Sequence, residues 1–322
     1  MRFSKRKSRG MRLFFATDIH GSETCWRKFL NSGKHYEANA LVLGGDMTGK
    51  ALVPVVDRGG GRWQATLLDN ATSLEGEEEV AEFEDSVRRR GYYPFRTTPD
   101  ELAELEADEE RRDRLFHQHM LDTVARWMQL ADERLAGSGV SCFVCPGNDD
   151  QFEVDEVISA AAGVALAEGR VVELGEYQMA STGWANRTPW ETFREEDEPR
   201  LAERIEKMVA EVTAPPELTI FNFHCPPYGS GLDDAPELTA DMKPKYAGRS
   251  SMPAGSTAVR DAIQEHQPAL SLHGHIHEAK GNTRIGRTLS INPGSSYEQG
   301  QLLGAVIDLD GGKVKRFVLT SG

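Results

Sequence analysis

Five short apolar runs, each followed directly by polar residues, constrain the fold of this chain more than any other feature. The runs are RLFFATD, NALVLGGD, VSCFVCPGND, LTIFNFHC and ALSLHGH. Each holds four to six apolar residues, many of them β-branched or aromatic, which is typical of strands buried on both faces. Helical patterns lie between some of the runs, as at residues 23–32 and 256–267. This alternation of strand and helix predicts an α/β sandwich.

The region 51–139 interrupts this alternation. It contains 11 Arg and Lys residues against 20 Asp and Glu residues, so a charge of −9 out of the chain's −14 lies there. The stretch LVPVVDRGGGRWQATLL predicts a hairpin, and apolar residues at helical spacing from Phe116 to Leu135 predict a long amphipathic helix. The acidic runs EGEEEVAEFED and ELEADEERRD are interpreted as solvated helix faces. We expect one domain over 1–322 that carries a mostly helical cap at 51–139.

The two ends of the chain follow other patterns. RTLSINPGSS and LLGAVIDLDGGKVKRFVLT predict strands, the last two joined as a hairpin at residues 310–312. Residues 1–10 are basic and are expected to form a disordered leader, or to reflect a start site upstream of Met11. The apolar piece after them is too short for a signal peptide, and no run reaches membrane-spanning length. A cytoplasmic protein without membrane contact is therefore expected.

Charge and cysteine spacing bear on several classes of function. A net charge of −14 disfavours broad binding to nucleic acid or acidic lipid, but it is compatible with a small anionic substrate held by metal ions. Cys142 and Cys145 form a C-x-x-C pattern, yet in a strand their side chains point to opposite faces. Core packing is therefore preferred for them over a zinc or redox site.

The polar residues that follow the apolar runs are types that bind metals. Ligands of open α/β sheets gather at the carboxyl ends of strands, so these residues are expected to meet. Asp18 and His20 are two positions apart and face the same side, while Asp46 follows two glycines that allow a sharp turn and could bridge two ions. The other candidate ligands are Asn148, His224, His275 and His277.

Each of these motifs alone also has a purely structural explanation. Gly-Asp and Pro-Gly-Asn-Asp are common in turns, and a histidine that ends an apolar strand can belong to the core. Together, however, the motifs supply a mixed set of nitrogen and oxygen donors that suits Mn, Fe or Zn. Coincidence of all five is improbable, so a metal site is the better interpretation.

In this order, DIH, GGD, GND, FHCPP and HGHIH resemble the five sequence blocks of the calcineurin-like metallophosphoesterase superfamily. The resemblance spans about Arg12 to Leu319 and implies a four-layer αββα sandwich with the insert as its variable part. It also implies two divalent metal ions (Mn, Fe, Zn or Ni) bridged by Asp46. The implied ligands of one ion are Asp18, His20 and His277, and those of the other are Asn148, His224 and His275.

Further residues are implied by the same resemblance. Asp150 matches an acidic residue that would orient His20. STGWANRTPW looks like a segment found in a branch of prokaryotic phosphoesterases, and NPGSS at 292–296 resembles the family's loop beside the site. Arg187 is a candidate for forked contact with a phosphate, although a surface arginine in a turn fits the sequence equally well. His273 is expected to pack or to support the site rather than to bind a metal.

The third block departs from the pattern of the better-known members. Those carry a histidine that acts as general acid or stabilises charge on the phosphate, whereas this chain has Asp149 there. Nearby cations favour an ionised carboxylate, so Asp149 is expected to support the metal ligands or to sort substrates rather than to serve as the acid. Loss of a general acid commonly costs about 10²–10⁴-fold in rate, yet other branches also lack this histidine. The candidate catalytic residues are Asp46, Asn148 and Asp149.

These features predict a metal-dependent hydrolase of phosphoric esters, either phosphodiesters or phosphomonoesters, that acts through a metal-bridging hydroxide. Its expected partner is a small phosphate-ester substrate, and no particular oligomeric state is indicated. One alternative is a scaffold protein on the same fold, but such relatives have eroded ligands and none of the seven is missing here. A nuclease is a third interpretation, against which the charge and the missing histidine both weigh.

Overall fold

The structure is a computed structural model that describes residues 10–239, 241–243, 245 and 250–322. Of the expected leader at 1–10, only Gly10 lies within the described residues, and it is exposed. Among the helices of the described part, none is long and apolar enough to cross a membrane.

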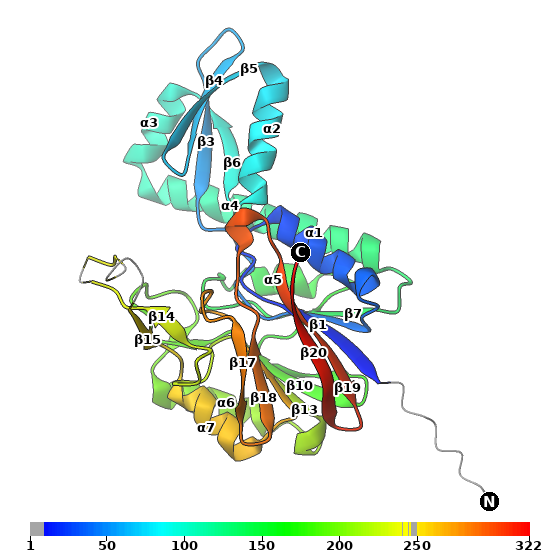
Figure 1. The fold of residues 1–322 in the computed structure, drawn as a ribbon. Coiled ribbons are helices and arrows are strands. Elements are labelled where there is room, and N and C mark those ends of the chain that lie inside the picture. The colour runs from blue at the N-terminus through cyan, green and yellow to red at the C-terminus, as the bar shows by residue number, and fades with distance from the viewer. Residues whose placement is uncertain (1–9, 240, 244, 246–249) are drawn as a thin grey trace, which may run out of the picture.

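Two six-stranded sheets form the centre of the molecule (Figure 1). The first contains, in order, β20 (Lys313–Ser321), β19 (Leu303–Asp310), β1 (Met11–Ala16), β2 (Ala40–Leu43), β7 (Ser141–Val144) and β8 (Ala165–Leu166). The second contains β17 (Gly281–Ile285), β18 (Thr288–Asn292), β16 (Leu270–Leu272), β13 (Thr219–Phe223), β10 (Tyr177–Thr182) and β9 (Arg170–Leu174). β19 and β20 form the predicted hairpin.

The inner strands of both sheets are parallel. In the first sheet β2 pairs in parallel with β1 and with β7, and in the second β16 pairs in parallel with β13 and with β18. The carboxyl ends of parallel strands share one edge of a sheet. The polar residues that follow these strands are thereby brought to the same end of the molecule.

Alternation along β1 shows how the sequence builds two cores from one strand. Leu13 and Phe15 pack in the core between the sheets, whereas Phe14 and Ala16 pack against helices on the outer face. Cys142 and Cys145 likewise are buried in different cores, as side chains that point to opposite faces of a strand should be.

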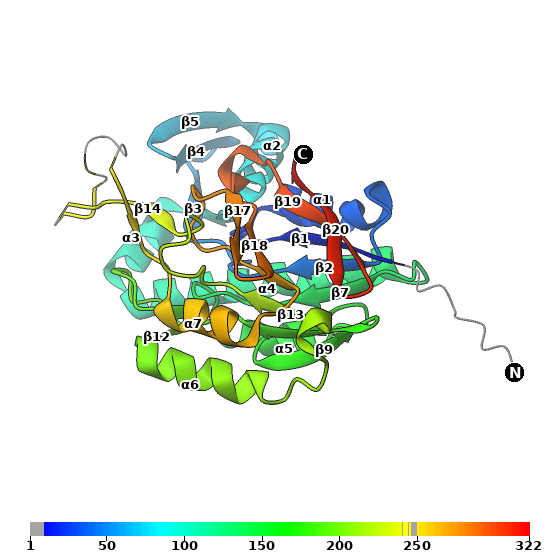
Figure 2. The same cartoon turned by 60° about the horizontal axis from the view of Figure 1, so that its bottom comes forward.

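Helices cover the outer face of each sheet and complete the four layers (Figure 2). The first sheet is covered by α1 (Glu23–His35), α4 (Glu109–Leu135) and α5 (Val154–Ser159), and the second by α6 (Glu198–Val209) and α7 (Thr257–His266). The Ser22 and Ser256 side chains cap α1 and α7 by accepting hydrogen bonds from backbone N–H groups. The αββα sandwich is therefore confirmed.

Helices account for most residues of the insert, as predicted, but the insert also contains a four-stranded sheet. Its sheet has the order β5 (Asn70–Glu75), β4 (Arg62–Leu67), β3 (Leu52–Asp57) and β6 (Tyr93–Thr97), with α2 (Gly76–Arg89) and α3 (Pro99–Ala107) beside it. The hairpin and the long helix were predicted correctly, but the sheet of four strands was not. Figure 1 shows this unit projecting from the sandwich. The second half of α4, including Trp127 stacked on Trp26, packs in the main core, so the separate part ends within this helix.

Short elements complete the described chain. Two small sheets pair β11 (Ala185–Asn186) with β12 (Glu195–Glu196) and β14 (Asp234–Pro236) with β15 (Ser251–Pro253), and the 3₁₀ turns are η1 (Pro216–Leu218) and η3 (Tyr297–Gln299).

Candidate metal centre

All seven predicted ligands meet at the carboxyl ends of five strands. They follow β1, β2, β7, β13 and β16, and the set is Asp18, His20, Asp46, Asn148, His224, His275 and His277. The first five are at most 3% exposed, whereas the last two are half-buried and line a cavity. Five segments far apart in the sequence thus build one polar site.

Six of these residues fall into two groups. The donor atoms of Asp18, His20 and His277 lie within 4.8 Å of one another, and so do those of Asp46, His224 and His275. These groups match the division between two ions that the sequence implied, with His275 and His277 in different groups.

The separations between donor atoms suit shared ions. The Nε2 atoms of His20 and His277 are 3.0 Å apart, and Nε2 of His277 is 3.4 Å from Oδ1 of Asp18. In the other group Nε2 of His224 is 3.3 Å from Oδ2 of Asp46. Ligands bound at about 2.0–2.2 Å to one ion lie roughly 3–3.6 Å apart, so the side chains fit divalent metals.

Buried polar atoms without partners mark the same place. Nδ1 of His20, Oδ1 of Asn148 and Nε2 of His224 are buried and accept or donate no hydrogen bond among the described residues. Such atoms normally have a partner in folded proteins. Nδ1 of His224 donates to the Gly44 carbonyl at 3.0 Å, which leaves Nε2 directed at the site.

The amide of Asn148 is oriented by a chain of hydrogen bonds that the sequence did not reveal. Its Nδ2 donates to Oγ1 of Thr192 at 2.8 Å, and the Thr192 hydroxyl donates to Glu195 at 2.5 Å. Because the amide nitrogen is held in this way, Oδ1 must face the ligand cluster. Thr192 and Glu195 lie just after the STGWANRTPW segment, which is the one signal that pointed to them.

The backbone is strained at the ligands. Asp18, His20, Asp46 and His275 have φ values of 52°, 35°, 49° and 67°, in the left-handed region that side chains other than glycine rarely adopt. Each such residue costs on the order of 1–3 kcal/mol and is found mainly at functional sites. Gly45 has φ 134°, and a Cβ there would lie 2.1 Å from Nδ1 of His224, so only glycine fits this turn.

Charge at the site favours a cation. Burial acts to raise the pKa of Asp18 and of Asp46, but the neighbouring histidines, with His224 foremost, together outweigh it, so the pKa of Asp18 falls to about 2 and that of Asp46 falls well below its usual range. Burial acts to lower the pKa of His224, but Asp46 and Asp18 raise it to about 10. Two ionised carboxylates therefore require positive charge beside them. Burial lowers the pKa of His20 to about 3 and of His275 to about 4, which keeps these imidazoles neutral.

Asp150 does not orient His20 as the resemblance implied. Its carboxylate accepts hydrogen bonds from the backbone N–H groups of Met47, Thr48 and Gly147 and from the Thr48 hydroxyl, and its partners in the described residues do not include His20. Burial, and then the charge of Asp46, raise its pKa, and these four hydrogen bonds oppose that shift. Asp150 ties the loop after β2 to the loop after β7, which fixes Asp46 relative to Asn148.

Two other predicted positions support the backbone around the ligands. His273 is fully buried, and its Nδ1 lies 2.8 Å from the Phe223 carbonyl and 3.1 Å from that of Cys225, so it packs beside His224 without joining the cluster. In the 292–296 loop the Ser295 hydroxyl donates to the Asp18 carbonyl at 2.6 Å. The loop thus braces the first ligand.

Asp149 contacts Lys50, a residue that sequence reasoning missed. Nζ of Lys50 lies 3.1 Å from Oδ2 of Asp149, and the same oxygen is 3.9 Å from Nδ1 of His20. Burial, and then Asp46, raise the pKa of Asp149 to about 6, against the lowering effect of Lys50. With a pKa of about 6, the carboxylate predominates at pH 7.

A cavity of about 630 Å³ opens above the ligands. The metal-side residues His20, Asp46, His275 and His277 form part of its lining, with Lys50 and Arg187 as its basic residues. Its apolar wall includes Pro189, Trp190, Pro236, Leu238 and Met242. Arg187 therefore lies where contact with a bound phosphate ester is feasible. We call this cavity the metal-side cavity.

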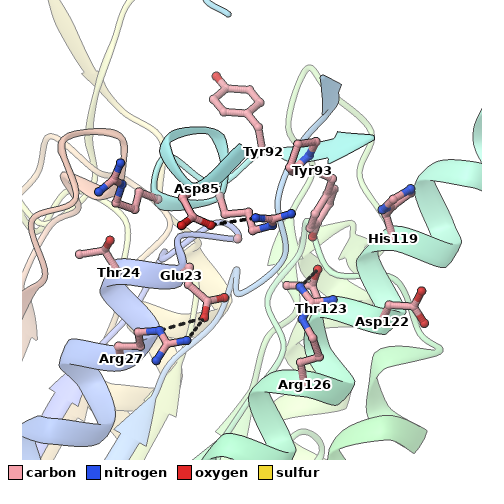
Figure 3. A pocket seen from close by; sticks show the side chains of 14 residues that line it. Glu23, Thr24, Arg27, Asp85, Tyr92, Tyr93, His119, Asp122, Thr123 and Arg126 are labelled. Atoms are coloured by element: carbon pink, nitrogen blue, oxygen red, sulfur yellow. Dashed lines mark hydrogen bonds and ion pairs between the residues drawn. The ribbon is translucent and has the colours of Figure 1, made fainter. Parts of the chain in front are cut away.

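The insert does not cover this cavity. No described residue from 51–139 lines it, which contradicts the expectation of a cap over the site. The insert instead borders a second cavity of about 760 Å³ at its junction with α1, which we call the junction cavity (Figure 3). Glu23 and Arg27 of α1 and Asp122, Thr123 and Arg126 of α4 line it.

Comparison with known proteins agrees with this fold. A scan against protein families found none that matches the chain. The uncharacterised protein MJ1162 of Methanocaldococcus jannaschii is 27% identical over 152 residues, which is 46% of this chain and 61% of that protein's length. The crystal structure of TT1561 of Thermus thermophilus is similar with a TM-score of 0.52 at 14% identity, over 97% of this chain and 98% of that one. Another solved structure reaches a TM-score of 0.54 at 18% identity, over 96% and 99%.

The likeness to these two solved structures over nearly the whole chain agrees with the four-layer fold that the sequence blocks implied.

Proposed function

We propose that this protein is a metal-dependent hydrolase of phosphoric esters that uses two divalent ions. The observation that carries the proposal is the convergence of seven donor residues in two groups, three of them with buried polar atoms that lack partners. Two ions bound there would lower the pKa of a shared water and polarise the phosphoryl oxygens. A scaffold protein has no need for strained ligands and orphaned donors at one point.

The chain's own residues provide the rest of the chemistry. Thr192 holds the amide of Asn148 toward the reacting group, and Asp46 lies between the two donor groups. The apolar wall that includes Trp190 excludes water and can receive an apolar or aromatic leaving group. Asp18 and Asp46 stay ionised and retain their affinity for cations.

The substrate is a small ester rather than a polynucleotide. Only two basic residues, Lys50 and Arg187, line the described metal-side cavity, and its wall is largely apolar. A nuclease would need a long basic groove to follow a backbone of phosphates. The net charge of −14 opposes such binding as well.

The test is metal analysis of the purified protein together with hydrolysis assays. Aryl phosphate monoesters and diesters are offered with Mn, Ni, Fe or Zn, and His275→Ala serves as the inactive control. We expect close to two ions per chain and turnover of at least one ester class. Bound metal without turnover of any ester would instead favour the scaffold interpretation.

A further inference from the structure

Lys50 and Asp149 form a charged pair at the rim of the ligand cluster. Nζ of Lys50 is 3.1 Å from Oδ2 of Asp149, and the backbone N–H of Asp149 donates to Oδ1 of Asp46 at 3.0 Å. Both residues line the metal-side cavity. The charge of Lys50 also reaches the ligands, because it acts to lower the pKa of both His20 and His277. An ammonium group is thus held beside the place where a phosphate would lie.

The backbone that carries Lys50 is fixed on both sides. Asp150 accepts hydrogen bonds from Met47 and Thr48, and the Gly49 N–H donates to the Tyr93 hydroxyl at 2.6 Å. A Cβ at Gly49 would lie 2.3 Å from the Gly91 carbonyl oxygen, so the loop packs directly against the insert. The backbone before Lys50 is therefore held in place by these contacts, so movement at this position is mainly that of the Lys50 side chain.

The side chain retains capacity to bind a ligand. The Lys50 side chain is 49% exposed and that of Asp149 is 24% exposed. An ion pair as exposed as this adds little to stability, so structural need does not explain it. An ammonium has three N–H donors, and Asp149 is the ion-pair partner of Lys50 among the described residues, which leaves donors for phosphate oxygens.

We propose that Lys50, positioned by Asp149, binds the non-bridging oxygens of the substrate phosphate and thereby favours phosphomonoesters over phosphodiesters. The inference rests on the proposed function and names its substrate class. A monoester phosphate carries up to two negative charges and a diester carries one, so an added cation stabilises the monoester more. Lys50 acts on charge and does not protonate the leaving group, so substrates with good leaving groups, such as aryl esters, are hydrolysed best.

The test compares Lys50→Met and Lys50→Arg with wild type, and Lys34→Met, an exposed lysine outside the cavity, is the matched control. We measure kcat/KM for an aryl phosphate monoester and for the diester with the same leaving group, inhibition by inorganic phosphate, and metal content. Lys50→Met should lower monoester kcat/KM by about 10- to 100-fold, the loss of one hydrogen bond between charged groups, and weaken phosphate inhibition in parallel. Diester turnover should fall much less, and Lys50→Arg should retain most of the monoester activity.

The positioning role of Asp149 is tested in combination. Asp149→Asn should weaken phosphate inhibition by several-fold in the wild-type background and have no further effect in Lys50→Met, because the residue acts through the ammonium. An equal effect of Asp149→Asn in both backgrounds would overturn the positioning role.

Other outcomes overturn the proposal itself. These are unchanged monoester kcat/KM and phosphate inhibition in Lys50→Met, equal losses for both esters, or loss of bound metal from this variant. If wild type hydrolyses no ester, the proposed function fails, and calorimetric titration of the metal-loaded protein with inorganic phosphate still decides the role of Lys50. Equal phosphate affinity in wild type and Lys50→Met would then contradict it.

Discussion

The metal-side cavity and the junction cavity are close in size but differ in how their polar groups are satisfied. At the junction, charged groups bind one another: Arg27 lies 2.7 Å from Glu23, and Arg88 lies 2.9 Å from Asp85. Figure 3 shows the side chains of Glu23 and Arg27 directed at each other. At the metal-side cavity, by contrast, His20 and Asn148 of its lining, and His224 of the same ligand cluster, keep buried polar atoms without hydrogen-bond partners among the described residues.

The difference teaches that unmet bonding capacity, and not volume, identifies the binding site. The junction cavity is the larger, at about 760 Å³ against about 630 Å³. A buried donor or acceptor without a partner costs about 1–3 kcal/mol, so a protein keeps several together only where a ligand completes them. Four of the candidate ligands also have strained, left-handed backbone. Among the described residues that line the junction cavity, no residue other than glycine has a positive φ.

The largest expected effect comes from replacing one histidine in each of the two cavities and comparing the variants. His275→Ala should lower kcat/KM by on the order of 10³-fold and reduce the metal content, because it removes a donor from one ion and several kcal/mol of charge stabilisation with it. His119→Ala, at the junction, should change neither quantity. Ester kinetics and elemental analysis of both variants provide the measurement. Equal losses in the two variants would mean that the contrast between the cavities is wrong.

Asp150 gives the next largest effect, on stability. Asp150→Asn replaces one carboxylate oxygen by an NH₂ group that faces N–H donors, so the hydrogen bonds accepted by that oxygen alone are lost and the NH₂ group opposes the donors. We expect the free energy of unfolding to fall by about 3 kcal/mol, measured by urea denaturation. The control is Asp122→Asn at the junction, where the carboxylate is exposed and a change below about 0.5 kcal/mol is expected. If Asp150 only oriented His20, metal content would fall while stability stayed the same.

Removal of metal should also destabilise the protein. An ion present at 100 times its Kd stabilises the folded state by about 2.7 kcal/mol, so chelation should lower Tm by roughly 5 °C. His275→Ala should show a smaller shift on chelation, and His119→Ala should show the full shift. Calorimetry with and without a chelator makes the comparison. A shift that is the same in all three proteins would place the stabilising ion elsewhere.

The fold and the meeting of the candidate ligands could be predicted from the sequence because both obey local rules. Strand periodicity located β1, β2, β7, β13 and β16, and the polar residue after each strand had to reach one edge of the sandwich. The placement of His275 and His277 in separate groups was implied by the resemblance to the superfamily, and the two donor groups in the structure agree with it. The pattern of apolar and polar residues along one strand is therefore enough to predict a residue's position when that position depends only on its own strand.

The remaining features depend on which loops meet, and no local pattern records that. Lys50 looks like an ordinary lysine after a glycine until the loops after β2 and β7 place it 3.1 Å from Asp149. Asp150 has the same limitation, because its four donors come from both loops. The insert was expected to cap the site, yet the direction of a lobe follows from the packing of α4 and not from its position along the chain.

The smallest expected effect concerns the ion pair between Glu23 and Arg27 at the junction. The two side chains are 21% and 50% exposed, so water screens them, and a coupling of about 0.2–1 kcal/mol is expected. A double-mutant cycle with Glu23→Gln and Arg27→Ala, followed by urea denaturation, measures this coupling. Glutamine is chosen because it keeps an acceptor for the Trp127 indole N–H, which donates to Glu23 at 2.8 Å. Metal content and ester turnover should not change in any of the variants. A coupling above about 2 kcal/mol, or a change in turnover, would show that the junction cavity is energetically linked to the metal centre. The contrast between a cavity whose charged groups pair with one another and a cavity whose polar groups lack partners would then no longer hold.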